Sequence, residues 1–413
     1  MKELRKIKLG ELVDFQTGPF GTQFSASEYV NEGIPVINVK NIGVGMVIRE
    51  NLDYISEQTR DRLSQHILKT GDIVFGRKGS VDRHAYIFKN ENGWVQGSDC
   101  IRARKKTQVN MLFLSQYLEG NGVKKQIINA AVGSTMSSLN TDILKDVIVL
   151  LPNIEEQNRI SEALKKIDDK ICLNNKINDN LEQQAKLLYD YWFTQFDFPD
   201  ESGKPYRSSG GKMVWNEQLK RDIPSGWTVI PFLEAASWES NSQPPKSEFI
   251  YEPQEGYVRF IQNRDYESNT HITYIPLTKN LSVVDRLDIL MDKYGDAGAV
   301  RYGIEGAFNV ALGKICAHNQ NYREYIRSFL SSDGIYNFLH NSCMASTRAS
   351  LNESNLAILN IPIPDEKLIL EYEKLLHKMR LSILKNNDET QKLIDLRNWL
   401  LPMLMNGQST IGD

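Results

Sequence analysis

Two stretches of the chain carry apolar residues in the alternating four- and three-residue spacing of a coiled coil. The first follows this spacing through positions 160, 164, 167, 171, 174, 178, 181, 185, 188 and 192. The second repeats the layout 212 residues later, through positions 372 to 404. Since the spacing continues over several heptads, it predicts two long helices, over residues 153–196 and 365–405.

Each seam is interrupted near its middle by a polar pair, Asn174 and Asn178 in the first and Asn386 and Thr390 in the second. Buried polar residues in a seam cost stability and fix the register of the partner helix. The two pairs lie opposite each other if the helices pair antiparallel across a pseudo-twofold axis. A helix of roughly 40 residues makes a rod about 60 Å long, which suits a spacer. The alternative is that each helix packs only against its own domain.

The regions before the helices repeat as well. The segment STMSSLN at 134–140 returns as STRASLN at 346–352, and both lead into an apolar run that ends in proline. Further upstream, GDIVFGRKGSV at 71–81 matches LDILMDKYGDAG at 287–298. Short β-rich runs separated by Gly, Asn and Asp turns are typical of mixed domains with much strand. The sequence therefore predicts an α+β fold with related domains at 1–152 and 228–364.

The segment between the first helix and the second domain, residues 197–227, is rich in Gly, Ser, Pro and charged residues, which indicates a connector. Its Phe, Tyr and Trp residues indicate that it lies on a protein surface. Residues 406–413 form a short tail.

Composition narrows the class of protein. With 413 residues, 41% hydrophobic and 24% charged, the chain suits a globular protein of two domains. No run approaches the roughly 20 apolar residues of a membrane span, and no apolar signal core follows the first residues, so we expect a cytoplasmic protein. Four widely spaced cysteines argue against a zinc site and against disulfides.

Charge points to a local patch rather than to a basic protein. The net charge is −3, but residues 60–106 contain eleven basic and five acidic side chains, a local charge of +6. Nucleic-acid binding, if present, must come from such patches.

The order of these segments resembles the specificity (S) subunit of type I restriction-modification systems, over essentially the full chain. The most specific pieces are GSTMSSLN and ASTRASLN, which lead through LLP and IPIP into the helices, and GDIVFGRKG. The resemblance implies two pseudo-symmetric target recognition domains, each reading one half of a bipartite sequence in double-stranded DNA. It also implies that two long antiparallel helices separate the domains and dock two methyltransferase (modification) subunits, which the restriction and motor subunits join afterwards.

Motifs for catalysis are missing from the sequence. A methyltransferase of this class carries an Asn-Pro-Pro-Tyr-like tetrapeptide and a glycine-rich cofactor turn, and a motor carries GxxxxGK[ST]; none of these occurs. The six histidines lack metal-ligand spacing. We therefore expect a non-catalytic subunit without a cofactor or metal.

Candidate DNA contacts are loop residues of the types that bond to phosphates and base edges. The strongest group is in GRKGSVDR, a glycine-punctuated loop whose alternative role is a solvated basic turn. The second copy of this loop has Lys293-Tyr294 in place of Arg77-Lys78, so the domains are expected to read different half-sites. The full set is Thr17, Lys40, Asn41, Arg77, Lys78, Ser80, Arg83, Thr135, Asn263, Arg264, Lys293, Tyr294, Arg301 and Arg348.

Apolar residues near the helix ends extend past what a two-helix seam buries, which makes them candidates for partner binding or for contact with the adjacent domain: Leu188, Trp192, Trp399 and Leu404. A rod of this length places the half-sites about one DNA turn apart, near 10 bp.

Two other functions stay open, a self-contained DNA-modifying enzyme with a divergent site and a coiled-coil scaffold that does not read DNA.

Overall fold

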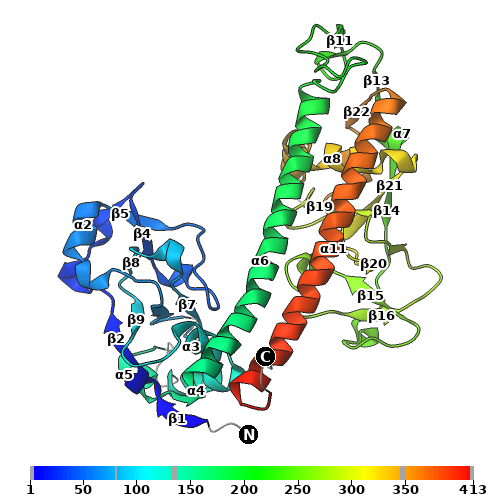
Figure 1. The fold of residues 1–413 in the computed structure, drawn as a ribbon. Helices are drawn as coiled ribbons and strands as arrows, with labels where there is room; N and C mark the ends of the chain where they lie inside the picture. The colour runs from blue at the N-terminus through cyan, green and yellow to red at the C-terminus, as the bar shows by residue number, and fades with distance from the viewer. Residues whose placement is uncertain (1–3, 80, 132–137, 345–349, 410–413) are drawn as a thin grey trace. The chain divides into compact units, whose positions relative to one another are not determined.

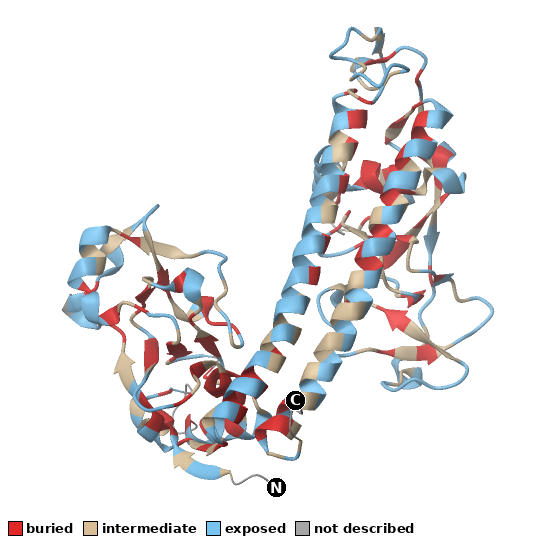
Figure 2. Cartoon of the chain, in the orientation of Figure 1, coloured by how far each residue is buried: buried red, intermediate tan, exposed pale blue. Residues whose placement is uncertain are grey.

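The two predicted helices form as continuous elements in the computed structural model, which describes residues 4–79, 81–131, 138–344 and 350–409 (Figure 1). Helix α6 spans Ile154–Tyr189 and continues into a π-helical turn, η6, at Asp190–Thr194. Helix α11 spans Glu366–Met405. Every position of the two predicted seams is buried or half-buried, and the intervening positions are mostly exposed (Figure 2). The period of the sequence therefore identified the covered face of each helix.

Polar contacts fix the relative direction of the helices. The Asn178 side chain donates to Asn387 at 2.7 Å and accepts from the Asn386 amide at 2.9 Å. One turn earlier on α6, the Asn174 amide donates to Glu389 at 2.8 Å. Residue numbers rise along one helix as they fall along the other, so the predicted antiparallel pairing is confirmed.

The chain folds into two compact units, and each contains parts of both helices. Unit 1 consists of Met1–Cys172 with Thr390–Asp413, and unit 2 of Leu173–Glu389. The core of unit 1 includes Leu164 of α6 and Leu401 of α11. The core of unit 2 includes Phe193 of η6 and Tyr372 of α11.

Unit 1 contains two four-stranded sheets, in the orders β2-β9-β6-β7 and β3-β5-β4-β8, and a separate antiparallel pair, β1-β10. Its strands are β1 (Arg5–Lys8), β2 (Val13–Thr17), β3 (Tyr29–Val30), β4 (Ile34–Ile37), β5 (Asp53–Ile55), β6 (Ile73–Gly76), β7 (His84–Tyr86), β8 (Val95–Gln96), β9 (Cys100–Lys105) and β10 (Ile148–Leu151). Its shorter helices are α1 (Leu9–Leu12), α2 (Glu57–Arg62), α3 (Met111–Leu118), α4 (Asn121–Ala131) and α5 (Thr141–Asp146).

Unit 2 repeats this plan with sheets β14-β21-β18-β19 and β16-β15-β20-β17 and the pair β13-β22. Its strands are β13 (Thr228–Pro231), β14 (Ala236–Ser240), β15 (Tyr257–Ile261), β16 (Tyr274–Pro276), β17 (Val283–Val284), β18 (Ile289–Asp292), β19 (Val300–Arg301), β20 (Gly306–Phe308), β21 (Leu312–Ala317) and β22 (Asn360–Ile363). Its shorter helices are α7 (Phe232–Ala235), α8 (Arg323–Ser331), α9 (Asp333–Met344) and α10 (Glu353–Leu356).

The correspondence of the two units extends to strand direction. In each, one strand pair of the second sheet is parallel, β4 with β8 in unit 1 and β15 with β20 in unit 2. In unit 2, β17 pairs antiparallel with β20. The equivalent place in unit 1 has a single antiparallel bridge, between Ile67 and Val95. The predicted α+β fold with two related domains is therefore confirmed.

The connector forms a two-stranded hairpin, β11 (Met213–Asn216) with β12 (Arg221–Pro224). Phe198 stacks between Tyr206 and Trp227, at ring-centroid distances of 4.7 and 5.4 Å. Both Phe198 and Trp227 belong to the core of unit 2. The connector is therefore packed on the unit, as its aromatic residues indicate.

The repeated SLN segment joins a loop to a helix in both units. Leu139 is fully buried, and its N–H donates to the carbonyl of Arg77 at 2.8 Å; Leu351 makes the same bond to Lys293 at 2.9 Å. The next residue caps a helix. The Asn140 side chain accepts from Ile143 N–H at 2.8 Å, and the Asn352 side chain accepts from Ser354 N–H at 2.9 Å. The repeated segment therefore recurs because both loops are held by the same backbone hydrogen bond, which we call the clasp.

We predict that Asn140→Ala and Asn352→Ala each lower the free energy of unfolding by about 1 kcal/mol, because each leaves N–H groups at a helix start without their acceptor. Chemical denaturation of the purified chain measures this. The matched controls Asn140→Asp and Asn352→Asp keep the acceptor and should cost less. Equal losses for the alanine and aspartate variants would contradict the capping role.

Unit 2 also contains a buried ionic cluster. Glu324 is fully buried and accepts from Arg327 at 2.9 Å and from Arg380 at 3.2 Å. The Glu373 carboxylate accepts from the Glu324 N–H at 2.8 Å. Burial, aided by the nearby Glu324 carboxylate, raises the pKa of Glu373 to about 7.

This pKa predicts a loss of stability as the pH rises. Between about pH 4.5 and 7 the folded chain keeps the Glu373 proton that the unfolded chain releases, so unfolding becomes easier toward pH 7. Glu373→Gln keeps an oxygen to accept from Glu324 N–H but cannot ionise. Because the carboxyl is partly exposed, we expect this variant to gain only about 1–2 kcal/mol at pH 8 and nothing at pH 4. Denaturation curves across this range would show a constant difference if Glu373 did not titrate.

Candidate nucleic-acid interface

Neighbouring strands of unit 1 bring four loops to one edge of the domain. Thr17 at the end of β2 pairs with Ile101, and Gly76 at the end of β6 pairs with Cys100, so both strands end where β9 begins. The Gly97 N–H donates to the Ile37 carbonyl at 2.9 Å, which adds the end of β4. We call the loops 17–20, 38–41, 77–79 and 97–99 edge 1.

The loops of edge 1 are in close backbone contact. A Cβ atom on Gly18 would lie 2.0 Å from the carbonyl oxygen of Gly97, and one on Gly97 would lie 2.1 Å from Oδ1 of Asn38. Only glycine fits such approaches. The edge is therefore held together by its backbone.

Arg77 and Lys78 lie at the centre of edge 1. The Arg77 N–H donates to the Asp99 carbonyl at 2.8 Å, and its guanidinium carbon lies 4.7 Å from the ring centroid of Phe20. Stacking on an aromatic face holds a guanidinium by a cation–π interaction. Lys78 is exposed and 3.6 Å from the Asp99 carboxylate, a pair worth little in solvent. Arg83 is also exposed.

The other described DNA-contact candidates of unit 1 differ in how far their side chains are exposed and in whether they already bond to the protein. Thr17 is half-buried at the end of β2. Lys40 pairs with Asp53 at 2.8 Å, and this bond lowers the pKa of the carboxyl. Asn41 is fully buried, and its amide donates to the carbonyls of Ile48 and Glu50. The Asn41 side chain therefore braces its own loop, and its contact with DNA stays a prediction.

Unit 2 builds the same edge, which we call edge 2, from segments 238–241, 262–266, 292–301 and 309–311. The Lys293 N–H donates to the Ala311 carbonyl at 2.8 Å, as Arg77 does to Asp99. The Asn309 N–H donates to the Ile261 carbonyl at 3.0 Å, as Gly97 does to Ile37. The two edges thus have these two backbone hydrogen bonds in common.

Side chains on edge 2 differ from those on edge 1. Lys293 is only 9% exposed, its Nζ lies 5.4 Å from the Trp238 ring centroid, and it donates to Ser240 Oγ at 2.9 Å. Burial lowers its pKa. The structure therefore makes Lys293 a brace, whereas its neighbour Tyr294 is 51% exposed.

Edge 2 also carries acidic residues. Arg301 pairs with the buried Asp292 at 2.8 Å and with Asp296 at 3.4 Å. Desolvation raises the pKa of Asp292 against the pull of Arg301. Of the candidates in the short helix that begins at Asn263, Asn263 itself is half-buried and Arg264 is exposed. The predicted residues Ser80, Thr135 and Arg348 lie outside the described residues.

The candidates for partner binding divide by exposure. Trp192 and Leu404 are 6% and 4% exposed and belong to the cores of units 2 and 1. Leu188 packs against the core of unit 2, and Trp399 is 58% exposed. The domain beside each helix covers Trp192 and Leu404, so these two residues stabilise their own units.

Sequence reasoning missed the rings of Phe20 and Trp238, which lie against the equivalent residues Arg77 and Lys293. The first edge has its ring in the loop after β2, and the second has it within β14. The two strands are not related by the 212-residue offset, so a search at that offset does not align these rings.

The described residues contain neither a metal-ligand cluster nor a membrane-spanning helix. No group of three or more His, Cys, Asp or Glu residues among them could hold a metal ion. None of the helices in the described part of the chain combines the length and apolar character that crossing a membrane requires.

Comparison with known proteins places the chain in a family. Residues 1–183 and 224–394 match the family described as type I restriction modification DNA specificity domain. The type I restriction enzyme MjaIX specificity subunit of Methanocaldococcus jannaschii is 24% identical over 427 residues, 98% of this chain and 93% of that relative. The MjaVIII specificity subunit of the same organism is 26% identical over 201 residues, and the match spans less than half of each chain, 46% and 45%.

A solved structure shares the fold. The S subunit of a type I restriction-modification system from M. genitalium has a TM-score of 0.63 at 14% identity, covering 98% of this chain and 96% of that one. The family match over residues 1–183 and 224–394 confirms the resemblance inferred from the repeats and the helices. The chain belongs to the type I restriction-modification DNA specificity family.

Proposed function

We propose that this chain reads a bipartite target in double-stranded DNA, through recognition domains at 1–152 and 228–364. The observation that supports this most directly is the pair of edges, which have the same backbone hydrogen bonds and different side chains. A scaffold used twice with different loop residues suits two half-sites of different sequence. The chain itself performs no catalysis, and methylation and cleavage belong to partner subunits.

The chemistry of edge 1 suits a guanine. A guanidinium can donate two parallel hydrogen bonds to O6 and N7 of guanine in the major groove. Stacking on Phe20 restricts the Arg77 side chain, which lowers the entropy lost when it binds. The exposed Lys78 and Arg83 suit phosphates, which position the protein without reading sequence.

Edge 2 suits other bases. Asp296 carries a half-exposed carboxylate, which can accept from the N4 amino group of cytosine. Tyr294, on the loop after β18, and Arg264, in the short helix after β15, are both exposed. The second half-site is therefore proposed to differ from the first.

We propose further that two methyltransferase subunits dock on the paired helices, and that restriction and motor subunits join through them. Trp399, on the last turns of α11, is the most exposed of the four residues predicted for docking. Large exposed apolar side chains mark protein contacts when they lie together.

Selection of DNA tests the bipartite target. Random-sequence duplexes are incubated with the chain and its cognate methyltransferase subunit, and the retained DNA is sequenced. We expect a consensus of two short blocks separated by an unread spacer, with block centres about 10 bp apart. Retention without any consensus would favour a scaffold that does not read DNA, and a single continuous block would contradict the two-domain proposal.

A residue-level prediction concerns Arg77. Arg77→Ala should relax the preference at one base of one half-site, at a cost of about 1–3 kcal/mol, and leave the other half-site unchanged. Binding of duplexes with single substitutions in each half-site measures this. The control Lys125→Ala removes an exposed charge from α4, outside edge 1. Equal weakening on all sequences would show Arg77 to be a phosphate contact.

A further inference from the structure

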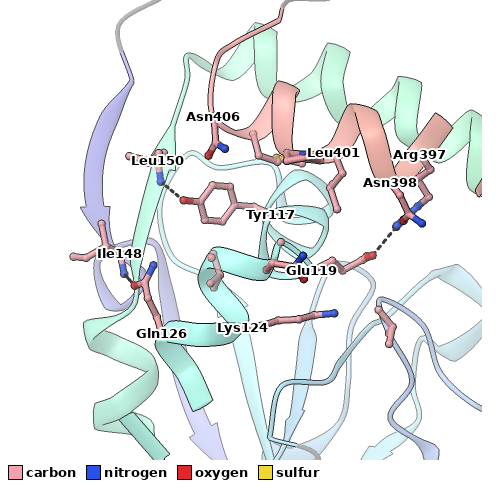
Figure 3. Close-up of a pocket in the computed structure, with 17 residues that line it drawn as sticks. Tyr117, Glu119, Lys124, Gln126, Ile148, Leu150, Arg397, Asn398, Leu401 and Asn406 are labelled. Atoms are coloured by element: carbon pink, nitrogen blue, oxygen red, sulfur yellow. Dashed lines mark hydrogen bonds and ion pairs between the residues drawn. The ribbon is translucent and has the colours of Figure 1, made fainter. Parts of the chain in front are cut away.

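Unit 1 contains a pocket of about 790 Å³ between the start of α4, strand β10 and the last turns of α11 (Figure 3). The Leu150 N–H donates to the Tyr117 hydroxyl at 3.0 Å on one side of it. The Arg397 guanidinium donates to Glu119 at 2.6 Å on another. Tyr117, Leu150 and Leu401 give the pocket an apolar floor.

Unit 2 contains a pocket of about 580 Å³ at the equivalent place, between the start of α9, strand β22 and the end of α6 with η6. Most of its lining residues lie 212 positions from lining residues of the first pocket. Three apolar pairs illustrate the match: Tyr117 with Phe329, Val123 with Ile335, and Met405 with Phe193. The chain therefore carries one pocket in two copies, and the opposite long helix completes each copy.

The rims of the pockets do not match. Lys124, Gln126 and Asn398 line the first pocket, and none of them has a counterpart in the lining of the second. Asp190 and the connector residue Arg221 line the second. A small polar ligand that relies on charge or hydrogen bonds would therefore not fit both. The apolar floor is the shared feature, so an apolar group is the ligand that both pockets can accept.

Beside each pocket a large apolar side chain faces solvent. Trp399 is 58% exposed and lies one turn before the lining residue Pro402. Leu187, 212 positions earlier, is 67% exposed and lies one turn before the lining residue Asp190. Residues three apart share a helix face. Each pocket therefore has one large exposed apolar side chain at its border, which favours a protein partner over a small molecule.

We propose that the two pockets bind the same apolar anchor, a side chain projecting from each of two copies of one partner. The inference rests on the proposed function, since it takes that partner to be the methyltransferase subunit. Duplication explains a stoichiometry of two, because one surface on the partner finds the same floor in each unit. Buried apolar anchors in pockets of this kind carry much of the binding energy of protein interfaces.

Two matched glycines are positions from which a larger side chain can fill the pockets. Gly122 in α4 and Gly334 in α9 each line their pocket, and a Cβ atom on either meets no heavy atom within 4 Å. Gly122→Trp and Gly334→Trp should each remove one methyltransferase subunit from the complex or weaken that site at least about tenfold. The double variant should bind neither copy. Native mass spectrometry and sedimentation of the full chain with the methyltransferase subunit measure the stoichiometry.

Control variants distinguish the effect of filling a pocket from the effect of placing a tryptophan elsewhere on the same helix. Lys125→Trp and Asn337→Trp add the same ring to exposed, equivalent positions on α4 and α9 outside the pockets, and they should leave two subunits bound. Trp399→Ala and Leu187→Ala change only exposed side chains and should weaken docking even if a filled pocket impairs folding.

The outcomes distinguish the inference from the function it rests on. If the unmodified chain binds no methyltransferase subunit, docking by this chain and the pocket inference both fail. If the unmodified chain binds two subunits and the double tryptophan variant, folded as judged by its Tm, also binds two with unchanged affinity, only the pocket inference fails.

Discussion

The packing of both long helices into both cores is the constraint on which the rest of the structure depends. Unit 1 buries Leu164 of α6 with Leu401 of α11, and unit 2 buries Phe193 of η6 with Tyr372 of α11. Removing apolar surface from water stabilises each unit by about 25 cal/mol per Å². The core of each unit contains residues of both long helices, so neither unit can complete its core without the antiparallel pair.

A backbone clasp connects this core to the proposed reading edges. The leucine of the repeated segment is buried, and its N–H holds the carbonyl of Arg77 in one unit and of Lys293 in the other. Because the clasp uses main-chain atoms, it fixes where the loop lies and leaves its side chains free to differ. Because the backbone is held independently of the side chains, the same fold can present Lys78 at edge 1 and Tyr294 at edge 2.

Polar residues in the helix pair serve alignment more than stability. Asn178 exchanges hydrogen bonds with Asn386 and Asn387, which an offset pairing would leave unsatisfied. The register also decides which residues of one helix meet the opposite domain. The two pockets depend on this choice, because each is lined by a domain and by the end of the helix that belongs to the other repeat.

The sequence by itself determined the repeat, the two helices and the face that each helix buries, because these follow from local periodicity and from an offset of 212 residues. It did not determine which candidates face solvent. Asn41 and Lys293 are enclosed by neighbouring loops, and Trp192 and Leu404 by the adjacent domains. Lys293, Trp192 and Leu404 are covered by segments far away in the sequence, and neither spacing nor residue type reports such packing. Only the tertiary structure showed which of the candidate side chains stay exposed.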